Sequence, residues 1–87
     1  FNLHPKTFSS NNMLETLLLS YNVIRSINKD IFSNMIKLSY LDLSFNKLKY
    51  LYSETFSKNL DLNRLILKNN YFLNLEPYLF SKNSKLQ

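Results

Sequence analysis

The hydrophobic positions in the stretch LSYLDLSFNKL, from Leu38 to Leu48, fit neither common period for long. Leu41 and Leu43 alternate as in a very short strand, whereas an amphipathic helix needs apolar residues three and four positions apart over a longer run. Asn46 then stands where the pattern predicts core. The stretch therefore predicts a strand of about three to five residues that ends in a turn.

The same pattern recurs every 24 residues along the whole chain. The repeated positions are leucine at Leu14, Leu38, Leu62 and Leu86, asparagine at Asn22, Asn46 and Asn70, and phenylalanine followed by serine at Phe8, Phe32, Phe56 and Phe80. Two further apolar columns are Leu3, Ile27, Leu51 and Leu75, and Ile24, Leu48 and Phe72. A fixed period of this length is typical of a solenoid, in which each repeat forms one coil.

The pattern L-x-x-L-x-L-x-x-N-x-L-x-x-L-x-x-x-x-F resembles the leucine-rich repeat family in its 24-residue extracellular form. The resemblance covers essentially the whole chain. It implies an α/β-type repeat solenoid, a horseshoe segment with a parallel β-sheet on the concave face and irregular or short helical turns on the convex face. We expect repeats at 14–37, 38–61 and 62–85, with a partial repeat at 1–13 and a new one starting at 86–87. Neither end has a polar cap, so we expect a longer array.

Inside each coil, alternate strand residues such as Leu41 and Leu43 should face the core, and the phenylalanine column should form a stacked spine. The resemblance implies that Asn22, Asn46 and Asn70 point inward and bond backbone groups of neighbouring coils. Asn11, Met35, Asn59 and Asn83 stand where the family favours leucine. We expect looser packing there, or support from Leu60. Because glycine is absent, left-handed backbone positions should fall to asparagine.

Side chains between the inward leucines should line the open concave face, which repeat proteins use for binding. The candidate ligand-binding residues are Thr16, Leu18, Tyr21, Tyr40, Asp42, Phe45, Arg64, Ile66 and Lys68; Ser20 and Ser44 share one of these columns. Aromatic residues with arginine are typical of interface anchors. A purely structural interpretation stays open: Asp42 pairs with Arg64 or Lys68, Tyr40 stacks on Arg64, and Tyr21 and Phe45 are packing residues.

The net charge of +5 raises the question of acidic partners. Only Arg64 and Lys68 fall on the predicted sheet face, which argues against a basic groove and against specific nucleic-acid binding. The other lysines considered fall on loops or the convex side and are typical of a solvated surface: Lys29, Lys37, Lys47, Lys49, Lys58, Lys82 and Lys85. Binding of heparin-like polyanions along a flank stays open.

Catalytic and metal-binding motifs are absent from the sequence. His4 is the single histidine and is expected in a loop, there is no cysteine, and no Ser/His/Asp set or glycine-rich phosphate loop occurs. We therefore expect no enzyme activity, no metal and no cofactor. No Asn-x-Ser/Thr acceptor and no apolar run near 20 residues occurs, so this segment should not insert into a membrane. The first residues lack the pattern of a signal peptide.

These observations predict a non-catalytic recognition module. The resemblance implies an extracellular or cell-surface ectodomain, of a Toll-like or related innate-immune or adhesion receptor, that binds a protein ligand or a second receptor chain. Homo- or hetero-dimerisation is compatible with this function. Two alternatives stay open: a secreted structural or adhesion protein without a signalling role, and an intracellular interaction scaffold.

Overall fold

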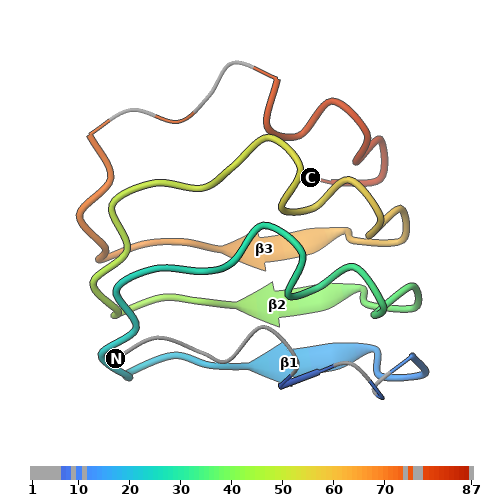
Figure 1. The fold of residues 1–87 in the computed structure, drawn as a ribbon, viewed down its shortest axis with the longest axis horizontal. Coiled ribbons are helices and arrows are strands. Elements are labelled where there is room, and N and C mark those ends of the chain that lie inside the picture. The colour runs from blue at the N-terminus through green and yellow to red at the C-terminus, as the bar shows by residue number, and fades with distance from the viewer. Residues whose placement is uncertain (1–6, 9, 11, 74, 76–77, 87) are drawn as a thin grey trace.

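Each coil contributes one short strand, and the strands form one parallel sheet (Figure 1). The computed structural model describes residues 7, 8, 10, 12–73, 75 and 78–86. Its strands are β1 (Thr16–Leu18), β2 (Tyr40–Asp42) and β3 (Arg64–Ile66), in that order in the sheet. Each strand pairs with the next in the register of the repeat, which places side by side Leu17, Leu41 and Leu65. The predicted leucine-rich-repeat solenoid is confirmed.

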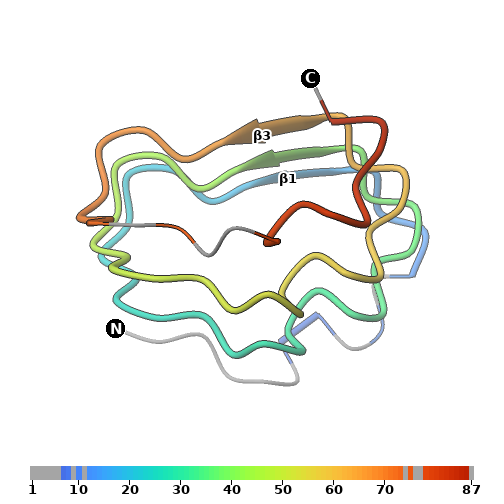
Figure 2. The same cartoon turned by 90° about the horizontal axis from the view of Figure 1, so that it is seen from above.

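The connecting chain returns on the side opposite to the sheet, so that successive coils lie on one another (Figure 2). In the described residues this return side consists of turns, without a helix of any length and hence without one that could span a membrane. The turn after Phe32 is closed by hydrogen bonds from the Met35 N–H to the Phe32 carbonyl (3.0 Å) and from the Leu38 N–H to the Met35 carbonyl (3.1 Å). Of the two forms expected for the convex face, the irregular one is present.

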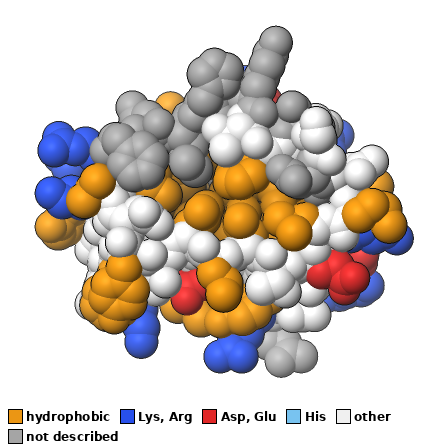
Figure 3. All heavy atoms as spheres, turned by 90° about the horizontal axis from the view of Figure 1, so that it is seen from below, with side chains coloured by type: hydrophobic (Ala, Val, Ile, Leu, Met, Phe, Trp, Pro, Cys, Tyr) orange, Lys and Arg blue, Asp and Glu red, His pale blue; other side chains and the backbone are white. Residues whose placement is uncertain are grey.

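Among the described strands, the inward leucines are fully buried in the middle coil. Leu41 and Leu43 are fully buried, whereas Leu17 and Leu65 in the outer coils remain partly exposed. At the β1 end, hydrophobic side chains gather in the middle of the coil and polar and charged ones surround them (Figure 3). Burial of one such leucine stabilises the fold by roughly 1.5–3 kcal/mol, so most of the stability depends on stacking between coils.

The phenylalanine column forms a continuous spine behind the sheet. Ring centroids are 6.1 Å apart for Phe8 and Phe32, 6.0 Å for Phe32 and Phe56, and 6.0 Å for Phe56 and Phe80, with the rings within 22° of parallel. Near-parallel rings at this separation are offset stacks, each worth roughly 0.5–1.5 kcal/mol beyond area burial. The spine therefore joins four successive coils.

The asparagines that follow β2 and β3 bond the backbone of their own coil and of the preceding coil. Asn22, after β1, is exposed, and its amide donates to the Leu19 (2.9 Å) and Ser20 (3.3 Å) carbonyls of its own coil. The amide of Asn46 donates to the Leu19 and Leu43 carbonyls at 3.0 Å each, and its Oδ1 accepts the Ile24 N–H at 3.2 Å. Asn70 forms the equivalent bonds one coil later. These amides satisfy buried backbone groups that have no strand partner.

The expectation of loose packing after the phenylalanine spine is wrong. Met35 and Asn59 have no exposed surface and Asn83 is 4% exposed, while Leu60 points away from the core at 55% exposure. The Asn59 amide donates to the carbonyls of Phe32 (3.0 Å) and Met35 (3.1 Å) in the preceding coil, and Asn83 donates to Phe56 and Asn59 in the same way. Asparagine replaces leucine here because its amide cross-links neighbouring coils. Asn11 lies outside the described residues.

Candidate functional site

The strand register brings the predicted binding residues together in two rows across the outer face of the sheet, which we term the sheet face. The first row is Thr16, Tyr40 and Arg64, and the second is Leu18, Asp42 and Ile66. In the second row Leu18 is 61% exposed, although it is a large apolar residue, and Ile66 is partly exposed. An apolar side chain in a row with a carboxylate is a mixed surface of the kind found in protein interfaces.

Tyr40 and Arg64 contact each other across β2 and β3. The guanidinium carbon of Arg64 lies 5.0 Å from the centre of the Tyr40 ring. A cation–π contact at an exposed site is worth about 0.5–1 kcal/mol, and it holds two interface-prone side chains in fixed positions. Tyr40 can therefore stack on Arg64 within the sheet and still contact a binding partner.

A second group of side chains follows the carboxyl ends of the strands. The rings of Tyr21 and Phe45 stack 4.3 Å apart at an interplanar angle of 8°, and the Lys68 ammonium lies 5.7 Å from the centre of the Phe45 ring. Tyr21 is 74% exposed, whereas Phe45 is partly buried. The predicted site thus continues from the sheet into the turns that follow it.

These turns use left-handed backbone, and the expectation that asparagine would supply it holds for only one of three positions. Tyr21, Phe45 and Asn69 have φ values of 57°, 56° and 58°. Left-handed geometry costs a residue with a side chain roughly 1–2 kcal/mol. The surrounding structure imposes it: the Tyr21 N–H donates to the Ser44 carbonyl (3.1 Å) and the Phe45 N–H to the Lys68 carbonyl (3.0 Å).

Asp42 does not form the ion pair with Arg64 or Lys68 that the structural interpretation left open. One of its carboxylate oxygens, Oδ1, accepts hydrogen bonds from the Ser44 N–H at 2.9 Å and the Ser44 hydroxyl at 2.6 Å. Ser44 is only 3% exposed, so it is not available on the sheet face. The carboxylate is held by the nearest donors in its own coil, and Arg64 and Lys68 contact aromatic rings.

Two flanks of the solenoid carry charged groups outside the predicted binding site. On one flank, Lys85 forms an ion pair with Asp61 at 2.9 Å, and this hydrogen bond lowers the pKa of the Asp61 carboxyl. On another, Arg25, Lys47, Lys49 and Tyr71 line one hollow. The signal for this second group is present in the repeat alignment, where Lys47 and Tyr71 occupy one column and Arg25 and Lys49 another.

The described part of the chain brings no three His, Asp or Glu side chains together as metal ligands. His4 lies outside the described residues. The chemical groups gathered on these surfaces are those of binding surfaces: aromatic rings, exposed aliphatic groups and cations.

Comparison with known proteins agrees with the geometry. A family model described as leucine rich repeat matches residues 1–48. Among 28 matching solved chains, the crystal structure of the leucine-rich repeat domain of APL1B has a TM-score of 0.88 and 27% sequence identity. The match covers 98% of this chain and 25% of that one, so the chain spans about a quarter of the length of the structure it matches. No curated protein matches.

The family and the fold are typical of non-catalytic protein-interaction modules. With a family model that covers more than half of its length and a repeat register that the strands reproduce, the chain belongs to the leucine-rich repeat family.

Proposed function

We propose that these repeats are part of an extracellular receptor ectodomain, of the Toll-like, innate-immune or adhesion kind, and that the sheet face binds a protein ligand or co-receptor. One observation carries the proposal: the contact between Tyr40 and Arg64 lies on the same sheet face as the exposed apolar side chain of Leu18, which stands on the strand next to Tyr40. Interface hot spots are enriched in tyrosine and arginine, in positions where neighbouring contacts exclude water.

The charges on this surface favour a protein partner that carries both acidic and apolar groups. Arg64 and Lys68 are exposed, whereas the Asp42 carboxylate already accepts two hydrogen bonds within its own coil. A partner carboxylate can therefore approach the two cations without displacing an ion pair to Asp42. Such contacts contribute to specificity and association rate more than to affinity.

The extracellular setting and the partner are tested separately. Staining of intact, non-permeabilised cells that express the tagged full-length protein should detect it at the surface or in the medium. A strictly intracellular signal would contradict the receptor assignment and favour the scaffold alternative.

For the binding face, the full chain should be screened against an array of secreted and cell-surface ectodomains. The partner found should then be measured against Tyr40→Ala and Arg64→Ala. Loss of either anchor should weaken binding about tenfold or more, since hot-spot truncations cost roughly 2 kcal/mol or above. Tyr50→Ala is the matched control, because Tyr50 is half-exposed and contacts Tyr52 rather than a strand residue. Parent affinity in both sheet-face variants would remove these residues from the site.

A further inference from the structure

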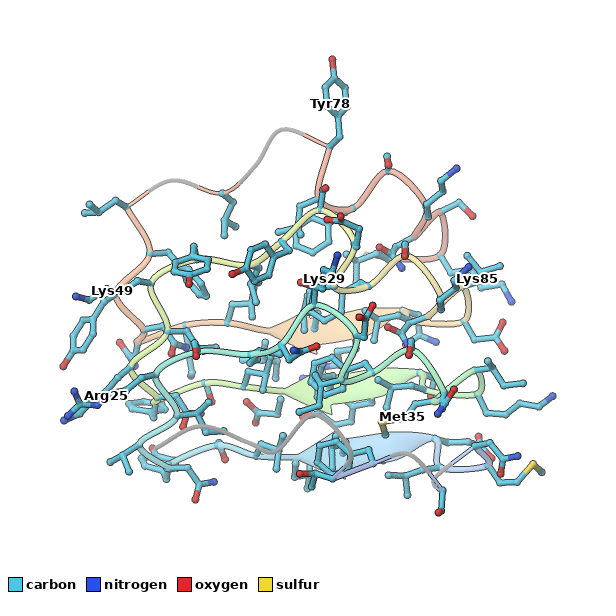
Figure 4. The ribbon with its side chains drawn as sticks, viewed as in Figure 1. Arg25, Lys29, Met35, Lys49, Tyr78 and Lys85 are labelled. Carbon is cyan, nitrogen blue, oxygen red and sulfur yellow. The ribbon has the colours of Figure 1, made fainter. Side chains whose placement is uncertain are left out.

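The described residues that line one hollow on the flank of the solenoid are three cations and an aromatic ring. The hollow has a volume of about 340 Å³ and is formed by Arg25, Lys47, Lys49 and Tyr71, which we term the basic flank. Arg25 and Lys49 project from the same side of the molecule, opposite to Lys85 (Figure 4). Three positive groups around one hollow repel each other, so the arrangement favours an anion between them.

The described carboxylates do not supply that anion. Glu15 and Asp61 line a different hollow, and Asp30 is not among the described residues that line this one. The Asp42 carboxylate accepts hydrogen bonds from Ser44, and the Glu54 carboxylate accepts one from the Ser53 hydroxyl. Two other hollows also contain a pair of lysines, but there a carboxylate lies among the lining residues. Each of those includes the Asp61 carboxylate among its lining residues. In the described part of the chain, the charge of the basic flank is therefore not neutralised locally.

The backbone beneath the basic flank is held firmly. The Lys47 N–H donates to the Ile24 carbonyl at 2.9 Å, and the Tyr71 N–H donates to the Leu48 carbonyl at 2.8 Å. These bonds join three successive coils directly under the hollow. The cations therefore stand on a fixed frame, which lowers the entropy cost of gathering them around a ligand.

The chemistry of the lining groups fits a sulfated sugar. The planar Arg25 guanidinium can bind two oxygens of one sulfate, and the two lysines supply mobile point charges for a second. Tyr71 is 58% exposed and offers a flat apolar face against which the C–H groups of a pyranose ring can pack. Lys47 and Tyr71 also line the adjoining hollow of about 370 Å³ beside Tyr21 and Phe45, so a chain of several sugars has room to continue.

Single-stranded nucleic acid fits less well. Proteins that bind it insert or stack successive bases on open aromatic faces. Here Tyr21 and Phe45 stack on each other at 4.3 Å, and Lys68 lies over the Phe45 ring. These contacts leave no gap for a base between the two rings. Tyr71 is the one aromatic ring among the described residues that line the basic flank, so this hollow offers no series of open rings for successive bases.

We propose that the basic flank is a binding site for a sulfated polysaccharide. The site goes beyond protein recognition by the sheet face and uses different residues. It would let the molecule bind an acidic polysaccharide while the sheet face remains open to a protein.

The test uses the full chain and immobilised heparin, with surface plasmon resonance as the readout. The variant Arg25→Gln/Lys47→Gln/Lys49→Gln removes the three charges, and the matched control Lys29→Gln/Lys58→Gln/Lys82→Gln lowers the net charge equally at exposed positions elsewhere. We expect the first variant to bind about tenfold or more weakly and the control to stay within about threefold of the parent. The slope of log affinity against log salt should fall by about two to three in the first variant alone. Circular dichroism melting checks that both variants are folded.

Competing probes separate the classes of ligand. Desulfated heparin, polyglutamate and oligothymidylate should each bind at least about tenfold more weakly than heparin, because they lack the sulfate groups that the three cations would share. Absence of parent binding to heparin, or an equal loss in the control variant, would overturn the proposal. Equally tight binding of polyglutamate or of the oligonucleotide would also overturn it and reassign the surface to that class of partner.

Discussion

An Asn59→Asp substitution replaces one buried nitrogen by oxygen with almost no change of shape. The Asn59 amide donates to the carbonyls of Phe32 and Met35 at 3.0 and 3.1 Å, and the side chain has no exposed surface. The introduced carboxylate would instead face two carbonyl oxygens with no donor for either. The substitution therefore tests whether this amide cross-links the coils.

The expected cost follows from the partners that remain. The Phe32 carbonyl keeps the Met35 N–H, and the Met35 carbonyl keeps the Leu38 N–H, at 3.0 and 3.1 Å. Loss of the two amide bonds should therefore cost only about 1–3 kcal/mol together. An unpaired buried charge adds about 3 kcal/mol or more. The unfolding free energy should fall by about 4 kcal/mol or more at pH 7, a large part of the 5–15 kcal/mol typical of a domain.

Urea unfolding of the full chain, followed by circular dichroism at pH 7 and pH 4, measures the effect. Burial should raise the pKa of the introduced carboxyl, so its penalty is present above the ordinary pKa and shrinks as the pH falls and the neutral acid forms. Asn59→Met is the control, because Met35 occupies the equivalent position one coil earlier and Asn59 Oδ1 has no hydrogen-bond partner among the described residues. It loses the two amide bonds without burying a charge, so it should lose no more than about 3 kcal/mol. An Asn59→Asp variant within about 1 kcal/mol of the parent at pH 7 would refute the cross-link.

Three further predictions concern single positions. Asn46→Leu should lower the unfolding free energy by about 2–4 kcal/mol, because it leaves the Ile24 N–H without its 3.2 Å acceptor, and an unchanged melting midpoint would contradict this role. At Phe45, where φ is 56°, the substitution Phe45→Asn should be tolerated. The unfolding free energy of Phe45→Val, measured by urea titration, should be about 1–2 kcal/mol lower than that of Phe45→Asn. The hydrogen bond from Lys85 lowers the pKa of Asp61, so its contribution is present above the ordinary value of 3.8 and is lost as the pH falls through the lowered one. Melting temperatures of Asp61→Asn should therefore differ from the parent at pH 6 and converge with it at pH 2.

The fold was predictable because several columns of the repeat carry the same period independently. Once Leu17, Leu41 and Leu65 are assigned to one inward column, the 24-residue register of the sheet follows. The error at Asn59 came from a different cause. An asparagine at a core position can mean lost packing or a hydrogen bond, and the outcome depends on whether a carbonyl with spare acceptor capacity lies within reach. That requires the path of the preceding coil, which the pattern of leucines does not specify.

In the candidate site, likewise, the sequence predicted where a side chain lies but not which partner it bonds. Alternation along the strands correctly placed Asp42 on the sheet face, but its partner is Ser44 two residues away rather than a cation in the next coil. A local hydrogen bond orders less chain and therefore forms in preference to a solvent-screened ion pair.

The role of a lysine likewise depends on its neighbours in adjacent coils. Lys37 and Lys47 are both surface lysines, but Lys37 shares a hollow with two carboxylates, and Lys47 shares one with two further cations and a tyrosine ring. In a solenoid those neighbours stand one period away in the sequence. The charges at equivalent positions of successive repeats can therefore distinguish a neutralised flank from an anion site. The net charge of the chain cannot make this distinction.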